Sequence, residues 1–182
     1  LQALWPLLAA MFAFAVSASG LLAPADNLLR DLRFAMDRHS PTGSIVLVDI
    51  DPESLATIGV WPWPRRIHGE ILDRLMEYGA LDVAFDIDFS TASNEQDDAM
   101  FEAALERAGG YAMLAAFRQL SGSRAEPVVN LPLPRFRRHA DPVAVNVAGD
   151  LAGNVRYAPY GLSLGGQDYP SLAAALAGVD RP

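Results

Sequence analysis

The first 25 residues of the chain, Leu1–Ala25, contain no ionisable side chain. An α-helix needs about 20 predominantly apolar residues to cross the hydrocarbon core of a bilayer, so this segment is long enough to span a membrane. Trp5 lies near one end of it, where an aromatic side chain suits the membrane interface. We therefore predict a transmembrane helix or signal anchor over residues 1–25. The alternatives are a buried core helix and a signal peptide with a cleavage site at Val16-Ser17-Ala18.

The composition excludes several classes of function. The chain of 182 residues has 22 acidic and 14 basic side chains, which gives a formal net charge of −8. Nucleic-acid binding depends on clustered cations that displace counterions, so we do not expect a nucleic-acid partner. All the basic residues are arginine, and lysine-dependent devices such as Schiff bases and P-loops are therefore absent. Cysteine is also absent, which excludes disulfides and thiolate metal sites.

Residues 26–182 alternate amphipathic stretches with short apolar runs, and we predict one domain with an α/β fold. Helical spacing predicts helices over residues 26–38, from Asp51 to Gly59, from Ile67 to Gly79, from Asp97 or Asp98 to Gly109, and over residues 170–176. Apolar runs predict buried strands over residues 45–50, 81–87, 111–117 and 143–147, and a short strand within residues 153–159. A helix between two such strands forms a right-handed crossover that joins parallel strands. The predicted architecture is a central, partly parallel sheet with crossover helices, preceded by the N-terminal transmembrane helix.

Two of the predicted strands end in similar acidic pairs, Asp49 with Asp51 and Asp86 with Asp88. Alternate strand residues share a face, and open α/β sheets bind ligands at the carboxyl edge of their strands. Carboxylates that converge there need a compensating charge, which a divalent cation or Arg65 can supply. The alternative is structural, because Asp51 precedes a proline as a helix cap does and Asp88 is placed to brace the loop after it.

The segment Trp61-Pro62-Trp63-Pro64-Arg65 is the most unusual local sequence. Each proline fixes its own φ and moves the preceding tryptophan out of the helical region, so we predict a stiff, extended stretch. It can form an aromatic wall of a ligand pocket, with Arg65 as an anion anchor. It can equally be a rigid connector whose rings cover the edge of the sheet, with Arg65 paired to a strand-end aspartate. We predict that His68 lies at the surface or caps the helix.

A phosphatase-like enzyme is a further alternative. The spacing of Asp86 and Asp88 after an apolar strand resembles the nucleophile and acid/base pair of haloacid-dehalogenase-type phosphatases, and Asp97-Asp98 resembles their distal acid pair. Those enzymes carry Thr or Val where this chain has Ser90, and they use a cationic phosphate anchor, usually lysine. This chain has no lysine, so only an arginine could take that place. A divalent cation would be the cofactor of such a site; otherwise no cofactor and no catalytic residue is expected.

Several short sequences occur in a characteristic order from about residue 26 to the end of the chain. They are DLRF at residues 31–34, IVLVDIDPESL at 45–55, GVWPWPR at 59–65, GA at 79–80, VAFDIDF at 83–89, DD at 97–98, GNVR at 153–156 and PSLA at 170–173. In this order they resemble the CHASE family, type two, the extracytoplasmic sensory domain associated with cyclases and histidine kinases. The WPWPR sequence is the most specific part of the resemblance.

The resemblance implies an input domain over residues 26–182, truncated at its C-terminus, that a membrane helix holds on the periplasmic side of the bacterial inner membrane. Further membrane helices and a cytoplasmic output module are expected to follow it. We favour a GGDEF/EAL module for cyclic di-GMP, with an adenylate or guanylate cyclase or a histidine kinase next. A homodimer is expected, because most such outputs act as dimers. The parent protein, and not this segment, would then carry the enzymatic activity.

No ligand residues follow from the resemblance, so the candidate site rests on position alone. The residues nominated to bind a small-molecule or envelope signal are Asp49, Asp86, Asp88, Trp61, Trp63 and Arg65. The main alternative is a non-enzymatic module that binds another envelope protein.

Overall fold

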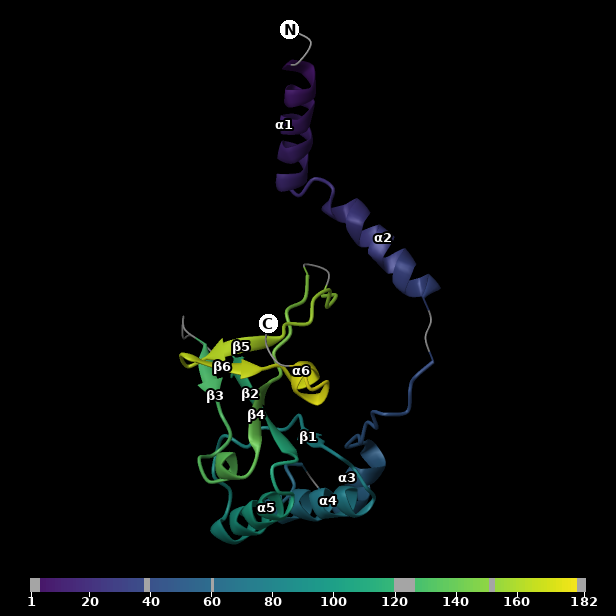
Figure 1. Ribbon diagram of the computed structural model, residues 1–182. Helices are drawn as coiled ribbons and strands as arrows, with labels where there is room; N and C mark the ends of the chain where they lie inside the picture. Colours follow the sequence, from purple (N-terminus) through teal and green to yellow (C-terminus); the bar gives the residue numbers. More distant parts are fainter. Residues whose placement is uncertain (1–3, 38–39, 60, 120–126, 151–152, 180–182) are drawn as a thin grey trace. The chain divides into compact units, whose positions relative to one another are not determined.

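The computed structural model describes residues 4–37, 40–59, 61–119, 127–150 and 153–179 (Figure 1). The chain divides into two units, Leu1–Ile50 and Asp51–Pro182. The first unit contains helices and an extended segment, whereas the second unit contains the sheet.

The first unit begins with two helices, α1 (Leu4–Ala18) and α2 (Ala23–Met36). A short turn joins them, in which Gly20 adopts a φ of 71° that suits glycine. No described residue of either helix is buried. Among the described residues, no single helix has the length and apolar character needed to cross a membrane. Trp5–Ala18 and Ala23–Met36 meet the length and composition criterion together, as a pair bent by 69°.

The extended segment from Ile45 to Ile50 differs from its prediction as a buried strand. None of the strand pairings in the described part of the chain includes it, and it has no strand conformation. Its apolar side chains are largely exposed: Ile45 79%, Val46 79%, Leu47 82%, Val48 58% and Ile50 37%. The predicted crossover between this segment and the next strand is therefore wrong for this structure. An apolar, β-branched composition favours a strand, but only hydrogen bonds to a neighbouring strand form one.

The second unit contains a mixed sheet and the remaining helices. Its elements are α3 (Pro52–Ile58), α4 (Arg65–Glu77), β1 (Val83–Phe85), α5 (Glu95–Arg107), β2 (Ala112–Gln119), β3 (Val128–Asn130), the short 3₁₀ helix η1 (Phe136–Arg138), β4 (Asp141–Ala144), β5 (Gly161–Leu164), β6 (Gln167–Pro170) and α6 (Leu172–Leu176). Strands β1 and β4 flank β2 and run parallel to it, and β3 pairs with β2 antiparallel. A separate hairpin is formed by β5 and β6. The prediction of an α/β fold with a partly parallel sheet is confirmed.

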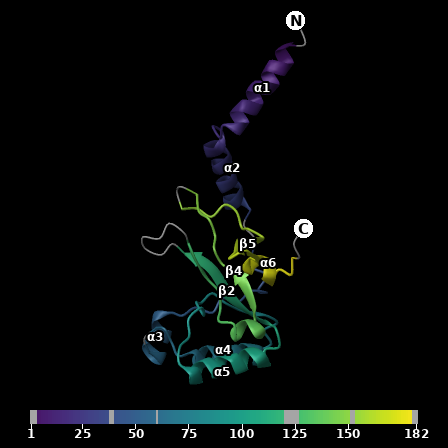
Figure 2. The same cartoon turned by 90° about the vertical axis from the view of Figure 1, so that its left-hand side faces the viewer.

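Helices α4 and α5 lie side by side and cover one face of the sheet (Figures 1 and 2). Their inner faces and the sheet enclose a core in which Leu72, Phe101 and Leu114 are fully buried. Helix α5 connects β1 to β2, so it is the crossover that the parallel pairing requires. The sequence predicted a crossover before the strand at residues 81–87, whereas the crossover in the structure comes after that strand.

The ends of several elements differ from their predictions. Helix α5 begins after Asn94, whose side chain accepts a hydrogen bond from the Asp97 amide at 2.9 Å, so neither Asp97 nor Asp98 is the cap. Asp51 does cap α3, because its carboxylate accepts from the Ser54 amide at 2.8 Å. Within residues 153–159 the described structure has only an isolated bridge, between Gly149 and Val155.

Candidate functional site

A hollow of about 260 Å³ lies at the carboxyl edge of the three parallel strands. It is lined by Asp86, Ile87, Asp88, Ala115, Phe117, Val145 and Asn146. Asp86 and Asp88 follow β1, whereas Val145 and Asn146 follow β4, on the other side of β2. The parallel pairing brings these chain ends to one edge, which is where open α/β sheets bind their ligands.

The two carboxylates of this hollow differ in their hydrogen bonding. Asp88 accepts a hydrogen bond from the Ser90 amide at 2.8 Å, so it braces the loop after β1 as one of the alternatives predicted. Asp86 is exposed, and within the described residues no hydrogen bond or ion pair involves its carboxylate. Asp86 is therefore the acidic group of the hollow that is open to interact with a ligand.

Asn146 holds the other side of the hollow and was not identified from the sequence. Its amide oxygen accepts from the Arg118 backbone N–H at 2.8 Å, and its amide nitrogen donates to the Arg118 carbonyl at 2.9 Å. The side chain thus continues the pairing of β4 with β2 beyond the last paired residues, Ala116 and Ala144. The role of Asn146 is visible only once the register of β4 against β2 is known. In the sequence, a single asparagine after a predicted strand gives no sign of it.

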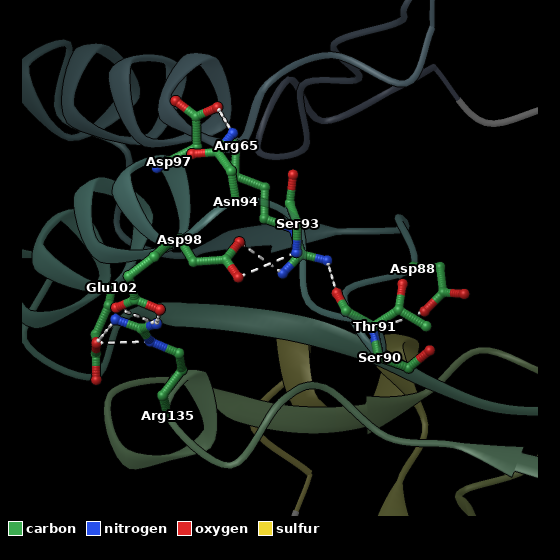
Figure 3. A network of polar contacts seen from close by, with 11 residues as sticks. Arg65, Asp88, Ser90, Thr91, Ser93, Asn94, Asp97, Asp98, Glu102 and Arg135 are labelled. Carbon is green, nitrogen blue, oxygen red and sulfur yellow. Dashed lines mark hydrogen bonds and ion pairs between the residues drawn. The ribbon is translucent and has the colours of Figure 1, made fainter.

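Arg65 lies at the start of α4 and is buried, with 7% of its surface exposed. Figure 3 shows its guanidinium between the Asp98 carboxylate, 3.1 Å away, and the Thr91 carbonyl, to which it also donates. The same group lies over the rings of Phe89 and Phe136, at 5.4 and 5.2 Å from their centroids. Burial lowers the pKa of Arg65, and the neighbouring Asp98 carboxylate opposes this effect. Arg65 therefore joins α4 to α5 and to the loop after β1.

The tryptophans of the WPWPR segment pack against His68. Trp63 is buried and donates from its indole nitrogen to the Gly59 carbonyl at 2.9 Å. Trp61 is 40% exposed and meets the rings of Trp63 and His68 edge-on, at centroid distances of 5.8 and 5.7 Å. The segment is thus a connector that covers the core, with one tryptophan still open to solvent.

His68 is not a surface or capping residue, contrary to its prediction. It is 3% exposed and lies among the rings of Phe85, Phe89 and Phe101 as well as those of the tryptophans. Burial and, to a lesser degree, the charge of Arg65 lower the pKa of His68 to about 4. The side chain is therefore neutral near pH 7. His68 lies four residues before Leu72, and this helical spacing places both side chains on the inner face of α4. The sequence did not predict the burial of His68, because only apolar residues were used to define the inner face.

Asp97 and Asp98, in the first turn of α5, are both engaged in ion pairs. Asp97 is paired with Arg66 at 3.0 Å, and hydrogen bonds from Asn94 and Arg66 lower its pKa. Asp98 accepts from Arg65 and from the Ser93 amide at 3.1 Å. Both carboxylates are almost fully buried, so they stabilise the contact between α4 and α5. The resemblance of this pair to the distal acids of a phosphatase stays a prediction that the geometry does not favour.

The nominated residues thus fall into three groups. Asp86 and Asp88 line the hollow, whereas Trp61, Trp63 and Arg65 belong to the packed region at the start of α4. Asp49 lies in the first unit, where it is exposed. Within the described residues, no group of three or more His, Asp or Glu side chains is arranged to hold a metal ion.

The comparisons with known proteins give one match. No curated protein and no solved structure shows significant similarity to the chain. The family model of the CHASE2 domain matches residues 7–180, which is nearly the whole sequence. The matched range includes the WPWPR segment, the aspartates of residues 49–51 and 86–88, and the cap of α6. The chain therefore belongs to the CHASE2 domain family.

Proposed function

We propose that this chain is the periplasmic input region of a bacterial inner-membrane signalling protein, and that the hollow at the strand edge receives its signal. CHASE2 domains are extracytoplasmic sensory domains found in signalling proteins, and they are not catalytic. The uncharged N-terminal segment and its exposed apolar helix α1 support attachment to a membrane. The observation that carries the ligand site is the open Asp86 carboxylate in a hollow at the carboxyl edge of the parallel strands.

The lining of the hollow favours a cationic ligand. Asp86 and Asp88 supply negative charge, Asn146 supplies an amide, and Phe117 and Val145 supply an apolar wall. A divalent cation with its water shell or an organic ammonium compound fits this combination, because carboxylates bind the charge and the apolar wall packs against carbon. Arg65 would act indirectly, because it donates to the Thr91 carbonyl in the loop that carries Asp88, whereas Trp61 and Trp63 pack against His68. Ligand contact by these three residues and by Asp49 stays a prediction.

Thermal denaturation tests this site. The chain, purified in detergent, is titrated with Mg²⁺, Ca²⁺, Mn²⁺, putrescine and spermidine, and its melting temperature is recorded. A ligand that binds the folded state raises the melting temperature with its concentration, and Asp86→Asn should abolish the rise. Asp82→Asn is the matched control, because Asp82 is an exposed carboxylate at the opposite end of β1. Equal shifts in both variants would contradict the site.

An envelope protein as the signal is the other outcome. It would be indicated if none of the five compounds shifts the melting temperature while cross-linking in the periplasm recovers one partner that depends on Asp86. We would then conclude that the edge of the sheet at Asp86 binds a protein and not a small molecule.

The output module is proposed on the family resemblance alone. We infer that a GGDEF/EAL module for cyclic di-GMP follows in the parent protein as a homodimer, with a nucleotide cyclase or a histidine kinase as the next candidates. Sequencing the gene beyond the region that encodes this chain identifies the module. Cyclic di-GMP levels in cells that express the full protein or its Asp86→Asn variant then test whether the input region controls it. If neither the full protein nor its Asp86→Asn variant changes the cyclic di-GMP level of the cells, this output module is wrong.

A further inference from the structure

Helix α2 carries large apolar side chains that no described residue of its own unit, Leu1–Ile50, buries. None of its residues is buried. The exposed large side chains of this helix include Leu28 at 61%, Leu29 at 59%, Leu32 at 50%, Phe34 at 82% and Met36 at 83%. Such a set of exposed apolar side chains on one short helix indicates a contact with another molecule or with lipid.

These side chains are not spread evenly around α2. At about 100° per residue, Leu28, Leu29, Leu32 and Met36 fall within one arc of about 100°. The polar residues Asp26, Asn27, Arg30, Asp31 and Arg33 occupy the opposite arc, and Phe34 lies among them. The helix therefore has one apolar side and one polar side.

The preceding helix indicates what covers the apolar side. Helix α1 contains no charged residue and exposes large apolar side chains over about half of its circumference, namely Trp5, Leu7, Leu8, Met11, Phe12 and Phe14. The other half carries smaller side chains, chiefly alanine. The chain bends by 69° between Trp5–Ala18 and Ala23–Met36. If α1 inserts along the bilayer normal, this bend turns α2 towards the plane of the membrane surface. A helix in that plane buries one side in lipid and leaves the other in water, which is the pattern that α2 shows.

We propose that α2 lies in the membrane interface with Leu28, Leu29, Leu32 and Met36 among the lipid chains. This inference rests on the proposed function, which places α1 in the membrane. Helix α2 carries two aspartates and two arginines, so its formal charge is zero. Its contact with the membrane is therefore driven by apolar burial, and a zwitterionic lipid such as phosphatidylcholine is sufficient.

Single-cysteine spin labelling tests this arrangement, since the chain contains no natural cysteine. The matched pair is Met36→Cys and Phe34→Cys, because both native side chains are apolar and equally exposed but lie on opposite sides of α2. The labelled chain is reconstituted into phosphatidylcholine vesicles, and collision rates with oxygen, which concentrates in lipid, and with a water-soluble nickel chelate are measured. We expect the label at 36 to favour oxygen and the label at 34 to favour the nickel chelate, by several-fold each. Anionic lipid or added salt should change neither ratio.

The other outcomes separate this inference from the proposed function. A Met11→Cys label in α1 reports on membrane insertion, and a water-accessible label there would contradict membrane attachment itself. If the label at 11 is in lipid while those at 34 and 36 are equally accessible to water, the interfacial helix is wrong and the attachment stands. If the label at 36 is shielded from both agents and shows spin–spin broadening that unlabelled chain removes, α2 pairs with a second copy, which also overturns the inference.

Discussion

The Arg65 guanidinium donates a hydrogen bond to the Asp98 carboxylate at 3.1 Å, and the two side chains are only 8% and 3% exposed. The pair links the first turn of α4 to the first turn of α5. Loss of one partner leaves the other charge buried and uncompensated. We expect Asp98→Ala to lower the free energy of unfolding by about 3–5 kcal/mol in urea denaturation.

An exposed ion pair on the same helix provides the control. Arg74 and Glu77 lie 2.9 Å apart, but they are 71% and 60% exposed, so Glu77→Ala should change the free energy of unfolding by less than about 1 kcal/mol. The double variant Arg65→Met with Asp98→Leu should lose much less than Asp98→Ala, because it leaves no unpaired charge. Equal losses for Asp98→Ala and Glu77→Ala would contradict the importance of burial.

The buried His68 should make the stability of the chain depend on pH. The pKa of His68 is about 4 in the folded chain, below the ordinary value of 6.5, so the unfolded chain takes up a proton first as the pH falls. The free energy of unfolding is therefore highest above pH 6.5 and declines as the pH falls towards 4. Urea denaturation at a series of pH values measures this slope. In His68→Leu we expect a flatter slope over the same range.

His139→Leu is the control for this measurement. His139 is partly buried and lies 3.9 Å from Glu102, outside the aromatic cluster around His68. If His139→Leu flattens the slope as much as His68→Leu does, the pH dependence does not come from the buried imidazole.

Local patterns predicted the helices better than they predicted the strands. The spacing of apolar residues indicated α2 and α4, and the Asp51 cap indicated α3, to within a few residues, because helical hydrogen bonds are local. The segment Ile45–Ile50 has the composition of a buried strand and yet is unpaired in this structure. Strand formation depends on a partner that is distant in the sequence, and a single run of residues does not specify it.

The candidate site shows the same division. The position of Asp86 and Asp88 after β1 followed from the sequence, because carboxyl ends of parallel strands share an edge. The contribution of Asn146 depends on β4 pairing with β2, and the partner of Arg65 depends on how α4 packs against α5. Such tertiary contacts between distant residues have no local sequence signal, so neither could be predicted.

Asn94 offers a test of where α5 begins. Its side-chain oxygen accepts from the Asp97 amide at 2.9 Å and satisfies one of the free N–H groups of the first turn. We expect Asn94→Ala to lower the free energy of unfolding by about 1 kcal/mol, whereas Asn94→Ser, which keeps a capping oxygen, should lose much less. Urea denaturation separates the two. Equal losses would mean that Asn94 acts through another contact.

The last prediction concerns Gly69, where the backbone of α4 lies close to α5. A Cβ atom at this position would lie 3.2 Å from the Cβ of Ala104 and 3.5 Å from the Met100 carbonyl oxygen. Glycine in a helix interior is about 1 kcal/mol less favourable than alanine, so the close approach of the two helices gives a reason for its presence here. Gly69→Val should overpack this contact and lower the free energy of unfolding by about 1–3 kcal/mol.

The neighbouring residue provides a control for Gly69→Val that uses the same new side chain. Glu70 is exposed on α4, so Glu70→Val should cost only the lower helix propensity of valine, less than about 1 kcal/mol. Combining Gly69→Val with Ala104→Gly removes the opposing Cβ atom, and the loss in the double variant should be smaller than the sum of the two single losses. Additive losses would show that α4 and α5 adjust to the extra volume, and the packing argument would then be wrong.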